Sequence, residues 1–113
     1  MLIEERIRDF LLSELSEDNI GVYLETPQTL PQSFVVLQIA ERDEENYING
    51  VTMEFRSYAQ SKYEAAILDE KVRNAMKTLH EGSDISAKLG GGNDSTDTAL
   101  KMYRYRSYFN LYY

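Results

Sequence analysis

The sequence predicts an α+β domain with an antiparallel or mixed sheet and two helices packed on one face, in the order α-β-β-β-α-β-β. Three observations lead to this fold class. Apolar and polar residues alternate over residues 51–59, which is typical of a strand with one buried face. Directly afterwards the apolar spacing becomes helical and remains so up to Leu79. Alternation returns over residues 100–113, which predicts a closing strand.

Length and composition limit the possible classes of protein. With 113 residues the chain is predicted to be one domain, residues 1–113, that buries about two-thirds of its unfolded surface. It has no cysteine, which excludes disulfides, thiolate metal sites and cysteine catalysis. The acidic start is unlike a signal peptide, and no apolar run approaches the roughly 20 residues of a membrane span. We therefore expect a soluble protein made in the cytoplasm, with no membrane partner.

The net charge of −7 is unevenly distributed. Residues 1–60 carry 4 basic and 12 acidic side chains, a balance of −8, whereas residues 61–113 carry 8 and 7, a balance of +1. Phosphate contacts by basic residues supply most of the affinity for nucleic acid. An acidic chain without a basic stripe is therefore not expected to bind DNA.

A first helix is predicted near the N-terminus, ending near Ser16, because its apolar residues share one side. These residues are Ile3, Ile7, Phe10, Leu11 and Leu15. Glu4 and Glu5 lie in the first turn, where negative charge suits the helix dipole. Residues 21–25 predict a short strand that must stop at Pro27, because proline cannot donate to a strand ladder.

The next segment predicts a β-hairpin. Residues 34–41 are apolar at nearly every position, which predicts a strand covered on both faces, central in the sheet or at an interface. Residues 42–49 are charged and are predicted to be the loop of an antiparallel hairpin leading to the strand at 51–59. That strand is predicted to bury Val51, Met53, Phe55 and Ala59 and to turn Thr52, Glu54, Arg56 and Tyr58 to the other face.

The second helix is predicted to begin at Ser61, whose side chain can cap the free amides, with Glu64 completing a capping box. Its buried stripe consists of Ala65, Leu68, Val72, Ala75, Met76 and Leu79. Asp69 and Arg73 are spaced for an i,i+4 ion pair and are predicted to point away from the sheet. Gly82 is predicted to end the helix in a left-handed conformation.

The C-terminal part predicts two more strands. Residues 84–89 predict a weaker strand, and the three glycines at 90–92 with the polar residues after them predict a mobile turn. One face of the closing strand carries Tyr103, Tyr105, Phe109, Leu111 and Tyr113, and the other carries Met102, Arg104, Arg106, Tyr108, Asn110 and Tyr112. Helices on one side of the sheet need only the first set, so the second set remains for another role.

Tyrosine and arginine are enriched at protein interfaces, so this second face is a candidate oligomer interface. Its candidate residues are Arg104, Arg106, Tyr108 and Tyr112. The counterpart on a neighbouring copy is predicted at or next to the acidic loop, at Glu41, Asp43, Glu44, Glu45 and Tyr47. The alternative is that Tyr108 and Tyr112 are ordinary cross-strand tyrosines half exposed to water.

The run SYAQSKYEAAILDEKVRNAM at residues 57–76, followed by DTALKMYRYRSYFNLYY at 97–113, carries a family resemblance. It resembles the small tail completion or tail terminator proteins of long-tailed bacteriophages, particularly those of Gram-positive hosts. The resemblance covers nearly the whole chain and rests on structural motifs. It implies a virion protein of the tail and neck, from a phage or a prophage, made in the bacterial cytoplasm. Such subunits close into a ring, commonly a hexamer, that caps the tail tube and joins it to the head-tail connector, and DNA passes through without specific binding.

The residues that usually carry chemistry do not form a site in this sequence. His80 is the single histidine and falls at a predicted helix end, where its charge suits the dipole. The acidic loop lacks the glycine and the spacing of a calcium loop. We therefore expect no catalytic residue, no metal and no cofactor. The alternatives are a small binding module or adaptor that acts on a host protein, and, less favoured, a small enzyme with an acid pair that the sequence does not reveal.

Overall fold

The computed structural model describes residues 2–16, 20–29, 31–45, 48–97 and 102–113, without the side chains of residues 43–45, 48–49 and 93–97. Its elements are α1 (Ile3–Glu14), β1 (Gly21–Tyr23), β2 (Phe34–Glu45), β3 (Ile48–Ala59), α2 (Lys62–Lys77), the short 3-10 helix η2 (Leu79–Glu81), β4 (Ser86–Asp97) and β5 (Met102–Tyr112). This order confirms the predicted α+β class and the sequence of helices and strands.

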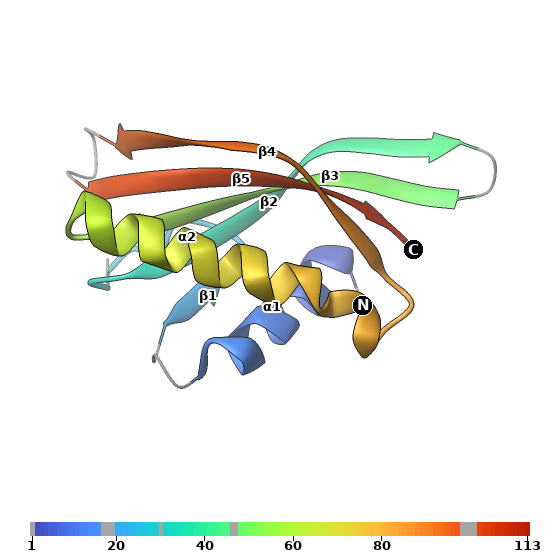
Figure 1. Ribbon diagram of the computed structural model, residues 1–113, viewed down its shortest axis with the longest axis horizontal. Helices are drawn as coiled ribbons and strands as arrows, with labels where there is room; N and C mark the ends of the chain where they lie inside the picture. Colours follow the sequence, from blue (N-terminus) through green and yellow to red (C-terminus); the bar gives the residue numbers. More distant parts are fainter. Residues whose placement is uncertain (1, 17–19, 30, 46–47, 98–101) are drawn as a thin grey trace.

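The five strands form one mixed sheet in the order β1-β2-β3-β5-β4. Only the β1–β2 pair is parallel, and the other neighbours are antiparallel. Figure 1 shows α2 lying along the long strands, with α1 and β1 below it. The predicted β2–β3 hairpin is therefore confirmed, and β4 forms one edge of the sheet.

The main core lies between the two helices and one face of the sheet. Its sheet residues include Leu37, Met53, Phe55 and Phe109, all at most 1% exposed. The helices contribute Ile3, Ile7, Leu11, Leu15, Leu68, Val72, Ala75 and Met76. The rings of Phe55 and Phe109 meet edge to face, with centroids 5.7 Å apart. The two amphipathic patterns in the sequence therefore bury one common face of the sheet, as predicted.

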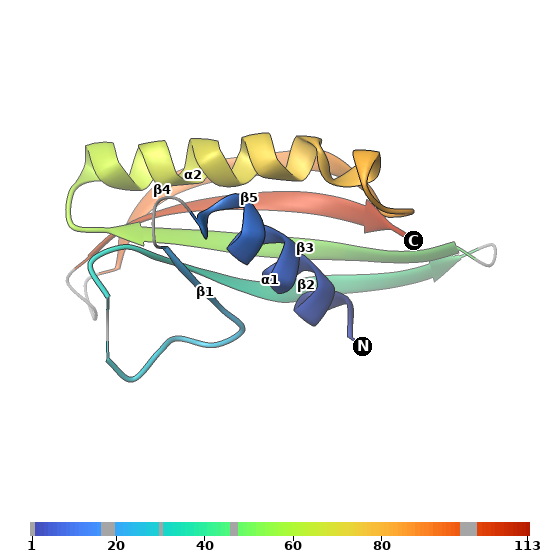
Figure 2. The same ribbon diagram turned by 90° about the horizontal axis from the view of Figure 1, so that it is seen from below.

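A second, smaller core lies on the opposite face of the sheet. Phe34 and Tyr58 stack with ring centroids 4.7 Å apart, and Val36 and Met102 are buried beside them. Figure 2 shows the connection from β1 to β2 on this side of the sheet, away from α2. The prediction that Tyr58 and Met102 lie on a face outside the core is therefore wrong.

The predicted loop at residues 42–49 is also wrong in extent. β2 continues to Glu45 and β3 begins at Ile48, so most of the acidic segment is paired strand. A register shift between Ile39 and Glu41 marks a bulge before this segment. Arg42 then turns towards α1 and lies 3.9 Å from the Glu4 carboxylate. The hydrogen bonds between β2 and β3 therefore hold this acidic segment as strand, although its composition is typical of a loop.

The three glycines at 90–92 also lie in a strand. The prediction of a mobile turn at residues 90–98 is therefore wrong for residues 90–97. β4 passes through all three glycines and pairs with β5. The register shifts between Leu89 and Gly91, and Gly91 has φ of 144°. A residue with a side chain rarely adopts this conformation, so the glycine permits a bulge within a continuous edge strand.

We expect Gly91→Ala to lower the free energy of unfolding by about 1–3 kcal/mol, because alanine is strained at this φ although the space around it is open. Gly82→Ala is the matched control, since Gly82 has φ of −117° and no atom within 4 Å of an added Cβ. It should be neutral or stabilise by up to about 1 kcal/mol. Urea unfolding of both variants checks this, and equal effects would mean that the bulge needs no glycine.

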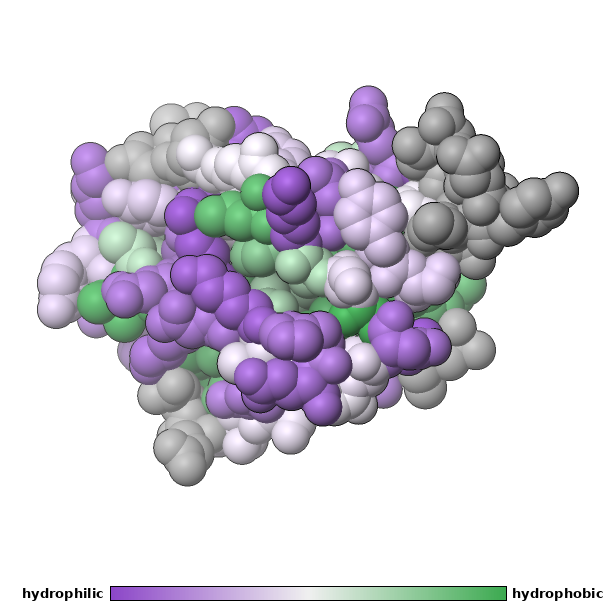
Figure 3. Space-filling view, turned by 45° about the vertical axis from the view of Figure 1, so that its right-hand side comes forward, coloured by the Kyte–Doolittle hydropathy of each residue, from purple (hydrophilic) through white to green (hydrophobic). Residues whose placement is uncertain are grey.

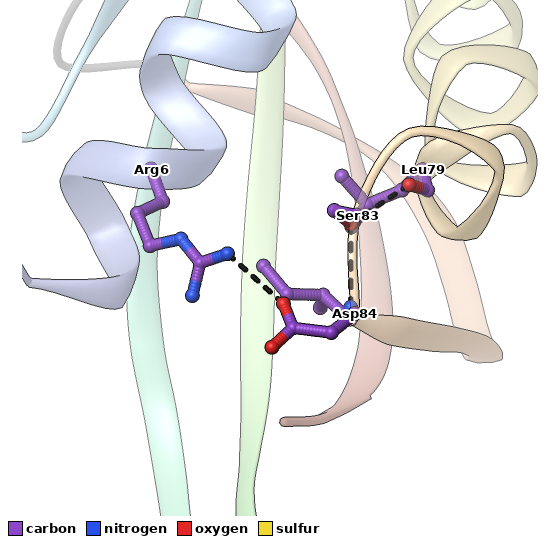
Figure 4. A network of polar contacts seen from close by, with 5 residues as sticks. Arg6, Leu79, Ser83 and Asp84 are labelled. Atoms are coloured by element: carbon purple, nitrogen blue, oxygen red, sulfur yellow. Dashed lines mark hydrogen bonds and ion pairs between the residues drawn. The ribbon is translucent and has the colours of Figure 1, made fainter.

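Side chains hold the start of α2 and the end of η2, which follows it. The Ser61 hydroxyl accepts a hydrogen bond from the Glu64 amide at 3.1 Å, which confirms the predicted N-cap. The predicted left-handed stop at Gly82 is wrong, because its φ is −117°. Instead, Ser83 donates to the Leu79 carbonyl at 2.8 Å and accepts from the Ile85 amide at 3.2 Å (Figure 4).

Figure 4 also shows Arg6 of α1 pointing towards Asp84, which follows the same turn, with 3.2 Å between Nη2 and Oδ1. This ion pair joins the first helix to the segment that leads into β4. Both side chains are well exposed, so the pair contributes at most about 1 kcal/mol and mainly orients the turn.

Candidate interaction surface

The sheet face opposite the helices remains partly accessible beyond the small core. We call this surface the open face, and it consists of Gln38, Thr52, Glu54, Arg56, Arg104, Arg106, Tyr108, Asn110 and Tyr112. Strand pairing places these side chains in cross-strand rows on β2, β3 and β5. The open face is polar and aromatic, in contrast to the apolar helix side of the same strands.

The centre of the open face carries an unusual row of charge. Arg56 of β3 lies directly opposite Arg106 of β5, and Arg104 lies opposite Tyr58 in the next row. Like charges directly opposite each other destabilise a strand pair. Glu54 offsets part of this repulsion, because its carboxylate lies 3.2 Å from the Arg56 guanidinium and its residue is only 8% exposed. Arginines on two neighbouring strands thus make a basic site on an acidic protein.

Tyr108 lies opposite Glu54, in the row after the arginine pair. Desolvation, together with the Glu54 carboxylate, raises the pKa of Tyr108 above its usual value, and the neighbouring arginines reduce this effect only in part. The Tyr108 hydroxyl donates a hydrogen bond to Glu54, so the row next to the arginine pair is held by a contact between β3 and β5. Tyr112, four residues further along β5, is 47% exposed, so the aromatic part of the open face reaches solvent.

The structure places the predicted interface residues in two regions. Arg104, Arg106, Tyr108 and Tyr112 share the open face. Glu41 is exposed and pairs with Thr52, and the backbones of Asp43, Glu44 and Glu45 pair with residues 48–50 of β3 in the last part of the hairpin. Tyr47 lies outside the described residues. Arg104 and Arg106 therefore lie towards one end of the strands, whereas Tyr112, which pairs with Gly50, lies at the hairpin end near the acidic segment.

Five residues of the open face are absent from the predicted interface set, namely Gln38, Thr52, Glu54, Arg56 and Asn110. Glu54 and Arg56 are recognisable in the sequence as polar residues of the strand at 51–59, but alternation alone does not show which strand lies beside them. The β3–β5 register brings Arg56 to Arg106 and Glu54 to Tyr108. The pairing of strands separated by a helix is thus the information that the sequence pattern lacks.

A buried polar cluster lies on the other side of the sheet, beneath α2. Asp69 is only 4% exposed, so the prediction that it points away from the sheet is wrong, although its predicted ion pair is present. Its Oδ2 lies 2.7 Å from Arg73 Nε, and its side chain also interacts with the Ser107 hydroxyl. The Arg73 guanidinium lies over Gly92 of β4, where an added Cβ would collide with it. The ion pair therefore connects α2 to the glycine segment of the edge strand.

Burial raises the pKa of Asp69 above its ordinary value of 3.8, and Arg73 and Ser107 oppose this shift only in part. The folded protein then holds the Asp69 proton more tightly than the unfolded chain does. The contribution of Asp69 to stability is therefore fully present below pH 3.8 and is lost as the pH rises through the folded pKa.

Asp69→Asn removes this titration and keeps the shape of the side chain. We expect the free energy of unfolding of the parent protein minus that of Asp69→Asn to decrease as the pH rises from below 3.8 towards neutrality. Urea unfolding of both proteins across this range measures the difference, in which the other carboxylates cancel. A difference that grows with pH would show that the ion pair with Arg73 outweighs the effect of burial.

The remaining surface offers shallow grooves. One of about 220 Å³ is lined by Ile20, Ser33, Tyr63, Glu64, Ile67, Leu68 and Lys71. Figure 3, in which the hairpin end comes forward, shows apolar side chains in small areas separated by hydrophilic ones. Among the described residues, no group of three or more His, Cys, Asp or Glu side chains is placed to hold a metal ion. His80 is exposed in η2.

Comparison with known protein families and with curated proteins identifies no relative of this chain. No protein-family model matches the chain, and a search of curated proteins finds no significant match. Within the described part of the chain, no helix has the length and apolar character needed to cross a bilayer. The open face and the hairpin are therefore the features on which a function can be argued.

Proposed function

We propose that this protein is a structural assembly subunit whose identical copies close into a ring. Its role would be that of a phage tail terminator or head-tail joining protein, at the end of the tail tube and in contact with the connector. The proposed location is the tail and neck of the virion, after synthesis in the bacterial cytoplasm. This proposal combines the family resemblance of the sequence with the surfaces of the folded chain.

One observation carries the proposal. The same long strands bear a basic site towards one end and an acidic hairpin at the other, with Tyr108 and Tyr112 on the face between them. A closed ring of identical subunits needs a heterologous interface, in which two different surfaces of the same chain meet. Arg56, Arg104 and Arg106 supply one surface, and the segment from Glu41 to Glu45 supplies its complement.

The net charge is compatible with the passage of DNA through such a ring. A chain with a net charge of −7 repels phosphate at short range, and salt screens this repulsion beyond about 10 Å. The lumen would then guide DNA without retaining it. Neither catalysis nor a cofactor has a part in this function.

The mass of the purified protein in solution tests the proposal. We expect sedimentation velocity and native mass spectrometry to give one discrete oligomer, with six copies as the commonest number for proteins of this kind. The number of copies should stay constant over a tenfold range of protein concentration, because a closed ring has no free end. A protein that stays monomeric throughout would favour the alternative, a small module that binds a host protein.

A further inference from the structure

We infer that the open face of one copy receives the acidic end of the β2–β3 hairpin of the next copy. This inference rests on the proposed function, because it names the two surfaces that would meet in the ring. The partner is a second copy of this chain, bound through carboxylates that approach the arginines Arg56, Arg104 and Arg106.

The first argument comes from the arginine pair. Arg56 and Arg106 occupy directly opposite positions on β3 and β5, an arrangement that is unfavourable within one chain. Glu54 is held 3.2 Å from Arg56 and lies diagonally across from Arg106. Arg104 and Arg106 also have contacts within their own chain, so an incoming carboxylate would add to or exchange with these contacts. A further anion at this site lowers the repulsion that the strand register creates.

The second argument comes from the hairpin. β5 ends at Tyr112, which pairs with Gly50, and β1 pairs with β2 only over Phe34–Val36. The last part of β2 and the start of β3 therefore extend beyond their neighbours as a two-stranded ribbon, visible at the right of Figure 1. Glu44 and Glu45 belong to this ribbon, and Glu41 and Asp43 precede it in rows where β3 is still paired with β5. The ribbon projects from the body of the subunit, so it can reach a neighbouring molecule.

The third argument is complementarity within a single sequence. The ribbon is acidic and the open face is basic, although the whole chain is acidic. Such charges set the register and the rate of association, whereas aromatic side chains supply most of the buried area. Tyr108 lies in the row next to the arginine pair, and the 47% exposed Tyr112 lies further along the same face of β5, so both fit this second role.

Charge reversal on each surface gives the test. The face variant is Arg104→Glu with Arg106→Glu, and the hairpin variant is Glu44→Lys with Glu45→Lys. The face variant should remain folded, because Glu at position 106 would oppose Arg56 and replace a repulsive pair by an attractive one. We expect either variant alone to assemble roughly tenfold or more weakly at low salt than the parent protein.

The control carries the same change of charge on another surface. Lys62→Glu with Lys77→Glu changes two basic residues of α2. This control and the face variant each move the net charge from −7 to −11, since each reversal of a basic residue subtracts 2. The control should assemble as the parent protein does. Circular dichroism verifies the fold of every variant, and Arg104→Gln with Arg106→Gln replaces the face variant if that variant does not fold, with a smaller loss of the same kind.

Mixing the two reversed variants tests whether their surfaces meet. In a mixture, the acidic hairpin of the face variant can bind the basic open face of the hairpin variant, and the reversed pair is complementary too. We therefore expect two assembly-defective variants to assemble when combined, as measured by sedimentation at low salt. If the mixture stays unassembled, or if each variant assembles like the parent, the two surfaces do not meet and the inference is wrong. The proposed ring-forming function is not affected by that result. A parent protein that is itself monomeric would instead overturn the proposed function.

Discussion

Replacing Phe109 with alanine is expected to lower the free energy of unfolding by about 3–5 kcal/mol. Phe109 is 1% exposed and lies at the centre of the main core, where β5 meets β3 and β4. Its ring packs edge to face on Phe55, so truncation leaves a cavity and removes an aromatic contact. Urea unfolding followed by circular dichroism measures this loss.

Tyr63→Ala is the matched control for this substitution. Tyr63 is 76% exposed on α2, so the loss of its ring should change the free energy of unfolding by no more than about 0.5 kcal/mol. If Phe109→Ala were as mild as Tyr63→Ala, the sheet would not be packed against the helices as described.

Tyr58→Ala is expected to have an effect of similar size, roughly 3–5 kcal/mol, although Tyr58 lies on the side of the sheet opposite the helices. The side chain is 1% exposed, stacks on Phe34 and is buried beside Met102. The loss would therefore show that the small core contributes to stability independently of the helix layer.

Tyr112→Ala serves as the comparison on the same side of the sheet. Tyr112 is 47% exposed, and we expect its removal to change monomer stability by about 0.5 kcal/mol or less. Equal and small effects of Tyr58→Ala and Tyr112→Ala, measured by urea unfolding, would contradict the presence of a second core.

Much of the fold was predictable because its elements have strong periodic patterns. The switch from alternation to helical spacing near Ser61 defines β3 and α2, and the cap at that residue marks their boundary. The long apolar run at residues 34–41 predicts a strand buried on both faces, which is confirmed for Phe34–Leu37 but wrong for the exposed Gln38, Ala40 and Glu41. Such patterns reflect burial of each element's own residues, which is a local property of the sequence.

The ends of the strands were less predictable, since they depend on neighbours. The acidic half of β2 and the glycines of β4 have low intrinsic strand propensity, yet each is paired with a strand that continues. Asp69 is an analogous case in α2, because polar character predicts exposure unless a buried partner is known. Its partners Arg73 and Ser107 come from the helix and from β5.

The candidate surface shows the same limit. Arg104, Arg106, Tyr108 and Tyr112 follow from alternation within one strand, so their common face was predictable. Arg56 and Glu54 join them only through the β3–β5 register, which spans the helix and β4 in the sequence. Charge on one strand can be predicted from the sequence, whereas the sum of charge on two strands requires the fold.

The central claim, that identical copies close into a ring, is tested most directly by negative-stain electron microscopy of the purified protein. We expect uniform particles with a central opening and a fixed rotational symmetry. The face variant Arg104→Glu with Arg106→Glu, imaged at the same concentration, should give few or none of them. Particles without an opening, or open filaments of variable length, would contradict the claim, since neither arrangement closes a heterologous interface on itself.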